Sequence, residues 1–414
     1  MHARNALVRL SAALVLGALA ASTTPLSLGT PASAQGAQVI KIGIDLPVSG
    51  GDAAQGIPTQ NGALLAISDA NARHAFGPFK LEADPLDDAV AGAHDPAQGA
   101  QNVKTFVSDS SVLAMFGPFN SNVAKAEIPI SNDAGLAMIA ASTTNPGLTK
   151  GEDAKKLRIS HPDVNTFFRV CTTDDRQGSV GASFARKFGY KKVFIVDDNE
   201  TYGKGLADVF EADFKKDGGT VLGHEHLTKG QTDFKALLTK AEGLGPDLIF
   251  FGGTTVTGGG LLRKQMGDSG LKGVTYFGGD GISDATFITT AGAMATNTYY
   301  TVAAPNPAKL PSAQAFITAY KKAYSTDIGA YSANAYAAAM IEIAAIEKAL
   351  KSNGGKMPTR AEVLKNIAAT KNFETPIGKI GFDANGDTTA GILSLYKITN
   401  GKAEFIDQVT EGGS

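Results

Sequence analysis

The sequence predicts an α/β protein made of two lobes, each a doubly wound parallel sheet covered by helices. Two observations support this prediction. Apolar, β-branched runs alternate with helix-like segments in two successive series of similar size, the first from residue 39 and the second from residue 193, and this alternation is typical of parallel sheets with helices on their faces. The length of 414 residues also leaves room for two or three domains of roughly 150 residues.

The first series contains three strand-like runs and two helical segments. The strands are expected at residues 39–46, 113–116 and 136–140, and the helices at residues 58–71 and from residue 120 towards residue 129. Asn120 and Ser121 predict the start of the second helix, because short polar side chains of this kind satisfy the free amides of a first helical turn.

The second series repeats the pattern and is followed by longer helices. Strands are expected at residues 193–196, 220–224, 247–251 and 274–277, with helices at residues 205–216, 234–242 and 261–269. Three more helices are expected at residues 313–324, 330–351 and 360–369, and two final strands at residues 392–398 and 403–409. The Asn400-Gly401 pair between these strands predicts a tight hairpin turn. Ligands of doubly wound sheets bind beyond the carboxyl ends of the strands, so two facing lobes would enclose a cleft.

The N-terminal residues 1–34 read as a secretory signal peptide rather than as part of the fold. Arg4 and Arg9 give a basic start, residues 10–21 are apolar, and Ala32-Ser33-Ala34 has the pattern of a cleavage site. A membrane anchor is the alternative, but the apolar core spans only about a dozen residues and a spanning helix needs about 20. We therefore expect a mature, soluble, periplasmic chain that begins near Gln35.

Charge and cysteine content narrow the class of protein further. The formal net charge is -2 and no long run of one sign occurs, which argues against nucleic acid as a partner. Cys171 is the single cysteine, so no intramolecular disulfide can form and the cleavage site carries no cysteine for lipidation. Because Cys171 ends the strand-like run FFRVC, we expect a buried thiol rather than a reactive one.

Two motifs could bind an anion or a metal ion, and each also has a purely structural interpretation. The glycine-rich segment 252–260 follows a strand, where it could cradle an anion, but it matches neither nucleotide-binding pattern and is expected to be a flexible loop facing the cleft. His224 and His226 lie two residues apart on a strand and hence on one face. A metal site would need further ligands, and none is spaced nearby, so we expect the solvent face of an edge strand.

Two acidic segments are also expected to have structural roles. Asp383, Asn385, Gly386 and Asp387 resemble half of a calcium loop that is not completed, and a tight turn is expected. Residues 87–88, both aspartates, are expected to be a solvated strand end. The sequence contains no nucleophile elbow, zincin or kinase motif. We therefore expect no enzyme, no cofactor and no metal.

Seven short segments occur in a fixed order along the chain. They are SGGDAAQG (49–56), FGPFNS (116–121), STTNPGLT (142–149), VDDNETYGKG (196–205), FFGG (250–253), GGDG (278–281) and IGFDANGD (380–387). Together with Gly62, Ala66 and Asn71, this series resembles the periplasmic leucine/isoleucine/valine-binding proteins, which are type I periplasmic binding proteins of branched-chain amino acid ABC transporters. The resemblance covers essentially all of the chain after the signal segment.

The resemblance implies a fold of two Rossmann-like lobes joined by a three-crossing hinge. Lobe 1 is expected to hold residues 38–173 and 304–392, and lobe 2 residues 174–303 and 393–414. Closure of the lobes on a bridging ligand would then be driven by contacts made only in the closed state.

The resemblance also implies a set of ligand-binding residues. Ser121, Ser142 and Thr144 occupy positions where the family holds the α-carboxylate of an amino acid, with hydroxyls and backbone amides. Tyr202 and Asp280 occupy positions where it holds the α-ammonium. This division is chemically reasonable, because a buried zwitterion needs neutral donors for its carboxylate and an acid for its ammonium.

This sequence departs from the family pattern at several positions. Gln55 and Thr254 occupy positions where leucine-binding relatives carry tyrosines near the ligand, and Asp280 replaces a longer glutamate. The disulfide of some relatives is absent. The head-group positions are kept, whereas the side chain of the ligand is left open, and a polar or small amino acid fits as well as a branched-chain one.

We therefore expect a monomeric periplasmic solute-binding protein of an ABC importer. It would capture an amino acid, branched-chain, aliphatic or small, between its lobes and deliver it to the permease subunits at the inner membrane. The alternative is a sensor of the same fold that binds an amide, a urea or an aromatic acid. Asp280 distinguishes the two, because an amide would not need a counter-ion.

Overall fold

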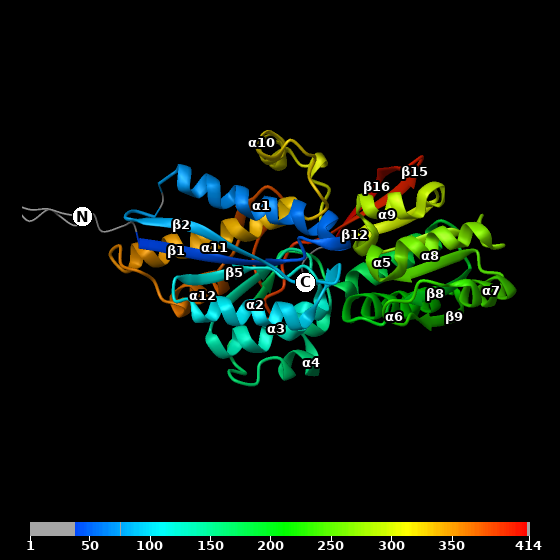
Figure 1. Ribbon diagram of the computed structural model, residues 1–414, viewed down its shortest axis with the longest axis horizontal. Helices are drawn as coiled ribbons and strands as arrows, with labels where there is room; N and C mark the ends of the chain where they lie inside the picture. Colours follow the sequence, from blue (N-terminus) through cyan, green and yellow to red (C-terminus); the bar gives the residue numbers. More distant parts are fainter. Residues whose placement is uncertain (1–37, 75, 412–414) are drawn as a thin grey trace, which may run out of the picture. The chain divides into compact units, whose positions relative to one another are not determined.

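The computed structural model describes residues 38–74 and 76–411, and the expected signal segment with its cleavage site lies outside these residues. Two sheets with helices packed on them make up this part of the chain (Figure 1). The predicted α/β class with parallel sheets is confirmed. Among the described helices, none combines the length and the apolar character that crossing a bilayer requires.

The first sheet has five parallel strands in the order β2-β1-β5-β6-β7. These are β1 (Gln38–Leu46), β2 (Phe79–Asp87), β5 (Val112–Phe116), β6 (Ala137–Ala140) and β7 (Phe167–Arg169). One face carries α1 (Ala53–Ala72), α11 (Ser332–Ser352) and α12 (Arg360–Ala368), and the other carries α2 (Pro96–Ser108) and α3 (Ser121–Ala134) (Figure 1). Because both faces are covered, every residue of β5, β6 and β7 is buried.

The second sheet has seven strands in the order β16-β15-β12-β11-β10-β8-β9. They are β8 (Lys192–Asp197), β9 (Thr220–His226), β10 (Leu248–Gly252), β11 (Thr275–Gly278), β12 (Thr298–Val302), β15 (Gly391–Thr399) and β16 (Lys402–Glu411). The strands from β9 to β12 are parallel, and β15 and β16 add an antiparallel hairpin. Its turn residues Asn400 and Gly401 have φ values of 51° and 72°, as the predicted tight turn requires.

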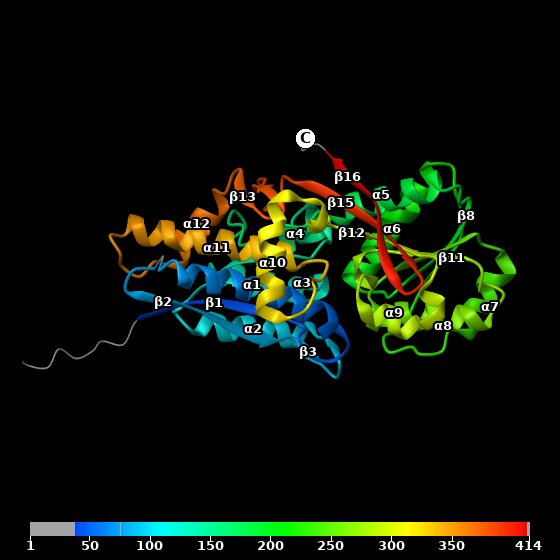
Figure 2. The same ribbon diagram turned by 90° about the horizontal axis from the view of Figure 1, so that it is seen from above.

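Helices cover this sheet as well. In Figure 2, α5 (Asp174–Lys187) and α6 (Thr201–Lys216) lie on one side of it, opposite α7 (Lys235–Leu244), α8 (Gly260–Gln265) and α9 (Ala285–Ala291). Shorter elements complete the described chain: β3 (Ala89–Val90), β4 (Ala93–His94), α4 (Gly151–Lys156), α10 (Gln314–Tyr324), β13 (Phe373–Thr375) and β14 (Gly378–Ile380).

The chain passes between the two sheet systems after β7, after β12 and before β15. This sequence of passages agrees with a three-crossing connection. The precise lobe boundaries stay a prediction, and the one placed between residues 392 and 393 falls inside β15.

Close packing of α1 on α11 depends on a glycine. A Cβ atom at Gly62 would lie 2.2 Å from the carbonyl oxygen of Ser332, so any larger residue would force the two helices apart. The facing side of α11 is rich in buried alanines, which keeps the two helix backbones near each other.

Several elements differ from the sequence prediction. The first helix begins at Ala53 and contains Pro58 in its second turn. The prediction missed β2, in part because its residues beyond Leu81 are only half-buried or exposed and include Pro85, as an edge strand allows. It also missed α2, although Asp95 and Pro96 form a strong start signal in which Asp95 accepts from the amides of residues 97 and 98.

Two local expectations are wrong. The glycine-rich segment is largely helical rather than an open loop: β10 ends at Gly252, and a π-helix (Thr255–Gly259), kinked at Gly258 where φ is 137°, leads into α8. Asp88 is fully buried rather than solvated, and neither of its carboxylate oxygens has a hydrogen-bond partner. Burial and the nearby carboxylate of Asp45 raise the pKa of Asp88 well above its usual range.

The predicted environment of Cys171 is confirmed. The thiol is free and fully buried.

The tight turn predicted at residues 383–387 also forms. Asp383 accepts there from the amides of Asn385 and Asp387.

Candidate functional site

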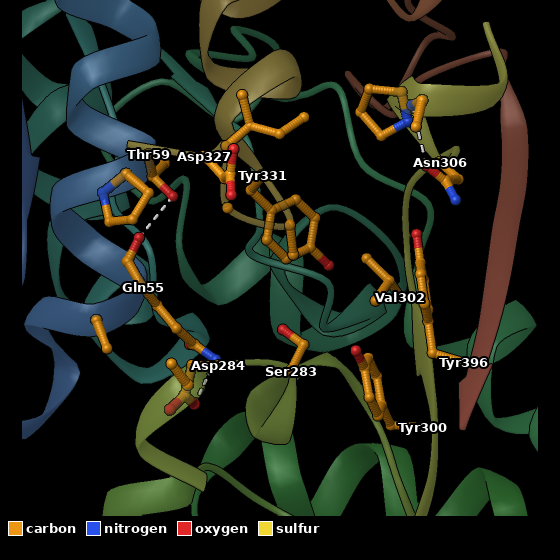
Figure 3. A pocket seen from close by; sticks show the side chains of 18 of the residues that line it. Gln55, Thr59, Ser283, Asp284, Tyr300, Val302, Asn306, Asp327, Tyr331 and Tyr396 are labelled. Atoms are coloured by element: carbon orange, nitrogen blue, oxygen red, sulfur yellow. Dashed lines mark hydrogen bonds between the residues drawn. The ribbon is translucent and has the colours of Figure 1, made fainter. Parts of the chain in front are cut away.

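A cavity of about 410 Å³ lies between the two sheet systems (Figure 3). The first turns of α1 and the segment before α11 line one side of it, and the segments after β11 and along β12 line the other. This volume falls in the range of small-molecule sites. The lining includes Gln55, Phe119, Asp284, Tyr300 and Tyr331.

Gln55 links the two sides of this cavity. Its side-chain amide donates to Asp284 Oδ2 at 3.1 Å and to the carbonyl oxygens of Asp280 and Gly281 at 3.2 and 3.4 Å. Thr255 donates to the same Asp284 oxygen at 2.6 Å. Figure 3 shows Gln55 reaching from α1 towards Asp284. The side chain of Gln55 is therefore already occupied by protein contacts across the cavity.

Asp280 is the centre of a buried polar cluster just after β11. Its Oδ1 accepts from Gln177 Nε2 at 2.6 Å and from the Tyr202 hydroxyl at 3.2 Å. Burial raises the pKa of Asp280 to about 6, although the hydrogen bond from Gln177 acts in the opposite direction. Both side-chain donors are neutral, so they orient the carboxylate without neutralising it.

The glycines beside Asp280 serve this cluster rather than an open approach to a ligand. A Cβ at Gly279 would lie 2.3 Å from the Tyr202 hydroxyl, and one at Gly281 would lie 2.2 Å from the carbonyl oxygen of Gly253. The space beside these glycines is therefore filled by Tyr202 and by the backbone of Gly253.

Hydroxyl groups lie beyond the carboxyl ends of β5 and β6. Ser121 begins α3, and its Oγ accepts from the amide of Asn145 at 3.3 Å. Ser142 donates to the carbonyl of Phe119 at 2.9 Å, which occupies its proton. The hydroxyl of Thr144 is buried beside the carboxyl of Asp174, with which it interacts.

Asp174 connects the hydroxyl side to the Asp280 cluster. Its amide donates to the carbonyl of Thr144 at 2.9 Å, and its carboxyl is fully buried beside the Thr144 hydroxyl. Burial raises the pKa of Asp174 well above its usual range, and the charge of Asp280 adds to that effect. The two acids are thus close enough to influence each other.

Aromatic side chains close the remaining sides. Tyr331 is buried, its hydroxyl has no hydrogen-bond partner, and its ring meets Phe119 edge-on with centroids 5.9 Å apart. Tyr300 and Tyr396 stack with their centroids 5.3 Å apart. Figure 3 shows Tyr331 projecting into the cavity from one side, with Tyr300 and Tyr396 on the other.

Polar contacts also join the two sheet systems, the two halves of the described chain, at a second place. His94 Nε2 lies 2.8 Å from Glu200 Oε2, and His94 Nδ1 lies 2.9 Å from Asp52 Oδ2. Burial lowers the pKa of His94, but the hydrogen bonds and charges of Asp52 and Glu200 outweigh it and raise the pKa to about 10. The imidazole is therefore cationic at neutral pH, between two carboxylates.

The structure brings most of the predicted site residues together. Tyr202 and Asp280 hydrogen bond to each other, and Gln55 contacts the backbone of Asp280. Ser121, Ser142 and Thr144 follow neighbouring strands of the other sheet. Thr254 has a capping role, because its hydroxyl accepts from the amide of Thr257 at 3.3 Å at the start of the π-helix. Of the predicted site residues, Gln55 lines the cavity, whereas the other six lie outside its lining.

Sequence reasoning missed several residues of this region. Asp284 lies four residues after Asp280 and could have been found as the end of the same polar segment. Asp174, Gln177 and Tyr331 carry no local signal, because their proximity to Asp280 arises only when distant segments meet.

Comparison with known proteins places this site in context. Residues 39–403 match a family model described as periplasmic binding protein. The chain is 33% identical over 367 residues to the Leu/Ile/Val-binding protein BraC3 of Rhizobium johnstonii, covering 88% of this chain and 92% of the relative.

Solved structures of amino acid-binding proteins are also similar to this chain. The leucine-binding protein LivK from Thermotoga maritima is similar with a TM-score of 0.77 at 27% identity, covering 89% of this chain and 98% of that one. The branched-chain amino acid substrate-binding protein LivJ from Streptococcus pneumoniae, in complex with isoleucine, is similar with a TM-score of 0.77 at 29% identity, covering 90% and 100%.

Proposed function

This chain belongs to the periplasmic binding protein family, and from that premise we propose that it is the substrate-binding protein of an ABC importer for a small amino acid. The observation that carries the proposal is the buried carboxyl of Asp280, oriented by Tyr202 and Gln177. A buried carboxylate of this kind favours a cationic partner, and an α-ammonium group supplies one.

The other end of the amino acid would meet neutral donors. Thr144 has a buried hydroxyl that a ligand carboxylate would share with Asp174, and Ser121, whose oxygen accepts from an amide, can donate its own proton. Ser142 would contribute less through its hydroxyl, because that proton is bound to the carbonyl of Phe119. Neutral donors suit a carboxylate that must leave again, since they hold it without a full opposing charge.

The side chain of the ligand would extend towards the cavity. Phe119, Tyr300, Val302 and Tyr331 supply apolar surface there, while Asp284 and Gln55 supply polar groups. This mixture accommodates an aliphatic side chain and also a short polar one. The relatives named for leucine, isoleucine and valine make the aliphatic ligands the first to be tested.

We assign no catalytic step to this site. The acids serve to hold charge, and capture followed by release to permease subunits requires only that the ligand stay unchanged. A periplasmic location and a monomeric state belong to the same proposal.

A thermal-shift screen tests the proposal. The mature protein would be heated with each of the twenty amino acids and with amides, urea and aromatic acids. A ligand that binds only the folded state raises the melting temperature, so an amino acid should give the largest shift, and titration calorimetry should then confirm a 1:1 complex. If only amides, urea or aromatic acids shift the melting temperature, the sensor alternative replaces the importer role.

A further inference from the structure

A second cluster of ligating side chains lies at the edge of the seven-stranded sheet. β9 is the edge strand and pairs in parallel with β8, with Asp197 opposite His226 and Ile195 opposite His224. Residues two apart on a strand share a face, so Asp197, His224 and His226 project to the same side. The expected edge strand is confirmed, but the neighbouring strand β8 supplies Asp197, a possible third ligand that the spacing along the sequence did not indicate.

The side-chain atoms that could bind a metal ion lie close together around Asp197 Oδ2. His224 Nε2 lies 2.7 Å from Asp197 Oδ2, and His226 Nδ1 lies 2.8 Å from the same oxygen. One atom from each of the three side chains lies within 4.8 Å of the others. Two imidazole nitrogens and a carboxylate oxygen facing each other make a three-ligand set of a kind found in zinc sites.

The distances suit a small ion after a modest adjustment. In a tetrahedral zinc site with bonds of about 2.1 Å, neighbouring ligand atoms are about 3.4 Å apart. The observed separations of 2.7 and 2.8 Å would have to widen by about 0.6 Å, which side-chain rotation can provide. The side chain of His226 is 45% exposed, so an ion could enter from solvent, and the remaining coordination position would be open to water.

A further carboxylate orients one of the histidines from outside the cluster. Glu211 Oε2 on α6 lies 2.6 Å from His224 Nδ1, and Lys215 forms an ion pair with the other oxygen of Glu211. A carboxylate on the second ring nitrogen of a metal-ligating histidine fixes the tautomer and turns the first nitrogen towards the metal. Here the first nitrogen, Nε2 of His224, is directed at Asp197, as such an arrangement requires.

We propose that Asp197, His224 and His226 form a binding site for a divalent transition metal of the zinc class, with Glu211 as the positioning residue for His224. The two imidazole ligands suit zinc, copper and nickel, whereas calcium and magnesium prefer oxygen ligands. None of the four residues lines the cavity, and none belongs to the set proposed to hold the amino acid, so the two sites share no side chain. A bound ion would tie the edge strand β9 to β8.

The test uses mature protein without a histidine tag, stripped of metal with a chelator and titrated with ZnCl₂. Competition with a chromophoric chelator should show one zinc ion bound per chain, and Co²⁺ loading should give the visible absorption of a tetrahedral centre. His224→Ala and His226→Ala should each weaken zinc binding at least tenfold, and Glu211→Gln should weaken it about 10–100-fold. His161→Ala, which removes an exposed histidine elsewhere, is the matched control and should bind zinc like the parent.

The proposal fails if the parent retains no zinc at micromolar concentrations, or if His226→Ala binds zinc within twofold of the parent. His226 is the most exposed of the three ligands, so its substitution is the least disturbing to folding, and circular dichroism would verify this. Amino acid binding should be unchanged in all four variants, which keeps this result separate from the proposed transport function.

Discussion

At the residue scale, Asp280 is the side chain on which the amino acid assignment depends. It is buried, it is oriented by two neutral side-chain donors, and it follows directly on a central strand of the second sheet. Removing one member of a buried, hydrogen-bonded charge pair costs about 2–5 kcal/mol. With about 1.4 kcal/mol per tenfold change in affinity, the loss is roughly 30-fold or more.

We therefore expect Asp280→Ala to weaken binding of the best amino acid at least about 30-fold, and Asp280→Asn to weaken it less, because the amide keeps the shape and loses only the charge. Titration calorimetry measures both. Asp268→Ala, an exposed aspartate of the same sheet system, serves as the control. An Asp280→Ala variant that binds within threefold of the parent would show that the ammonium is held elsewhere.

The same residue predicts a pH dependence. Burial raises the pKa of Asp280 to about 6, and a neighbouring ammonium favours the ionised form and lowers that pKa again. Binding should therefore release a proton at and below pH 6, and affinity should fall by up to about tenfold for each pH unit below 6. Calorimetry in buffers of different ionisation enthalpy counts the protons. Uptake of protons at pH 6, or affinity that is constant from pH 7 to pH 5, would contradict the assignment.

At the element scale, Thr254 shows how the glycine-rich segment is held. Thr254 and Thr257 form a reciprocal capping box, and Thr257 also donates to Asp198 at 2.7 Å. The family resemblance placed Thr254 beside the ligand, whereas the structure uses its hydroxyl to begin a helix.

Thr254→Ala should lower the free energy of unfolding by about 0.5–2 kcal/mol, since it removes the cap, and should leave ligand affinity within threefold of the parent. Thr254→Ser keeps the hydroxyl and should be close to the parent in both respects. Urea unfolding and calorimetry measure the two effects. A loss of affinity without a loss of stability would return Thr254 to the binding site.

His94 on β4 forms a polar bridge to Glu200, the residue before α6. His94 is buried between Asp52 and Glu200, and Asn122 also donates to Glu200 at 3.0 Å. Separation of the two halves would break the contacts to Glu200, so the bridge favours the arrangement in which the halves meet.

His94→Gln should weaken ligand binding about tenfold or more, because part of the ion-pair energy of roughly 2–5 kcal/mol would no longer assist closure. His74→Ala, an exposed histidine outside the bridge, is the control. Unchanged affinity in His94→Gln would mean that the bridge is equally strong with the halves apart.

At the scale of the whole molecule, residues of both sheet systems line the cavity, and Gln55 contacts Asp284 across it. His94 and Glu200 join the two sheet systems at a second place. A ligand that touches both sides stabilises the closed arrangement by its differential contacts, and by no more than those contacts supply. Transport proteins of this family need such a change, since capture and release are different states.

Small-angle scattering should accordingly show a smaller radius of gyration with the ligand than without it, and mass spectrometry should recover the ligand unchanged. The chain contains no tryptophan, so tyrosine fluorescence, to which Tyr202 and Tyr331 contribute, is the optical probe of closure. A chemically altered ligand would make the protein an enzyme, and identical scattering curves would contradict closure.

The sequence by itself determined the α/β class, the order of most strands and helices, the final hairpin and the buried state of Cys171. These follow from periodicity and turn chemistry, which act between residues a few positions apart. By comparison with the family it also indicated Tyr202 and Asp280, which the structure brings into contact.

Only the tertiary structure decided which polar groups lose water and which distant ones meet. Asp88 looked like a solvated strand end and is fully buried, and the histidines of β9 gained Asp197 from the neighbouring strand. Asp174 and Gln177 on α5, and Tyr331 before α11, reach the surroundings of Asp280 from two other segments. Desolvation and long-range pairing depend on how the chain crosses between the sheets, and no local pattern in the sequence encodes that.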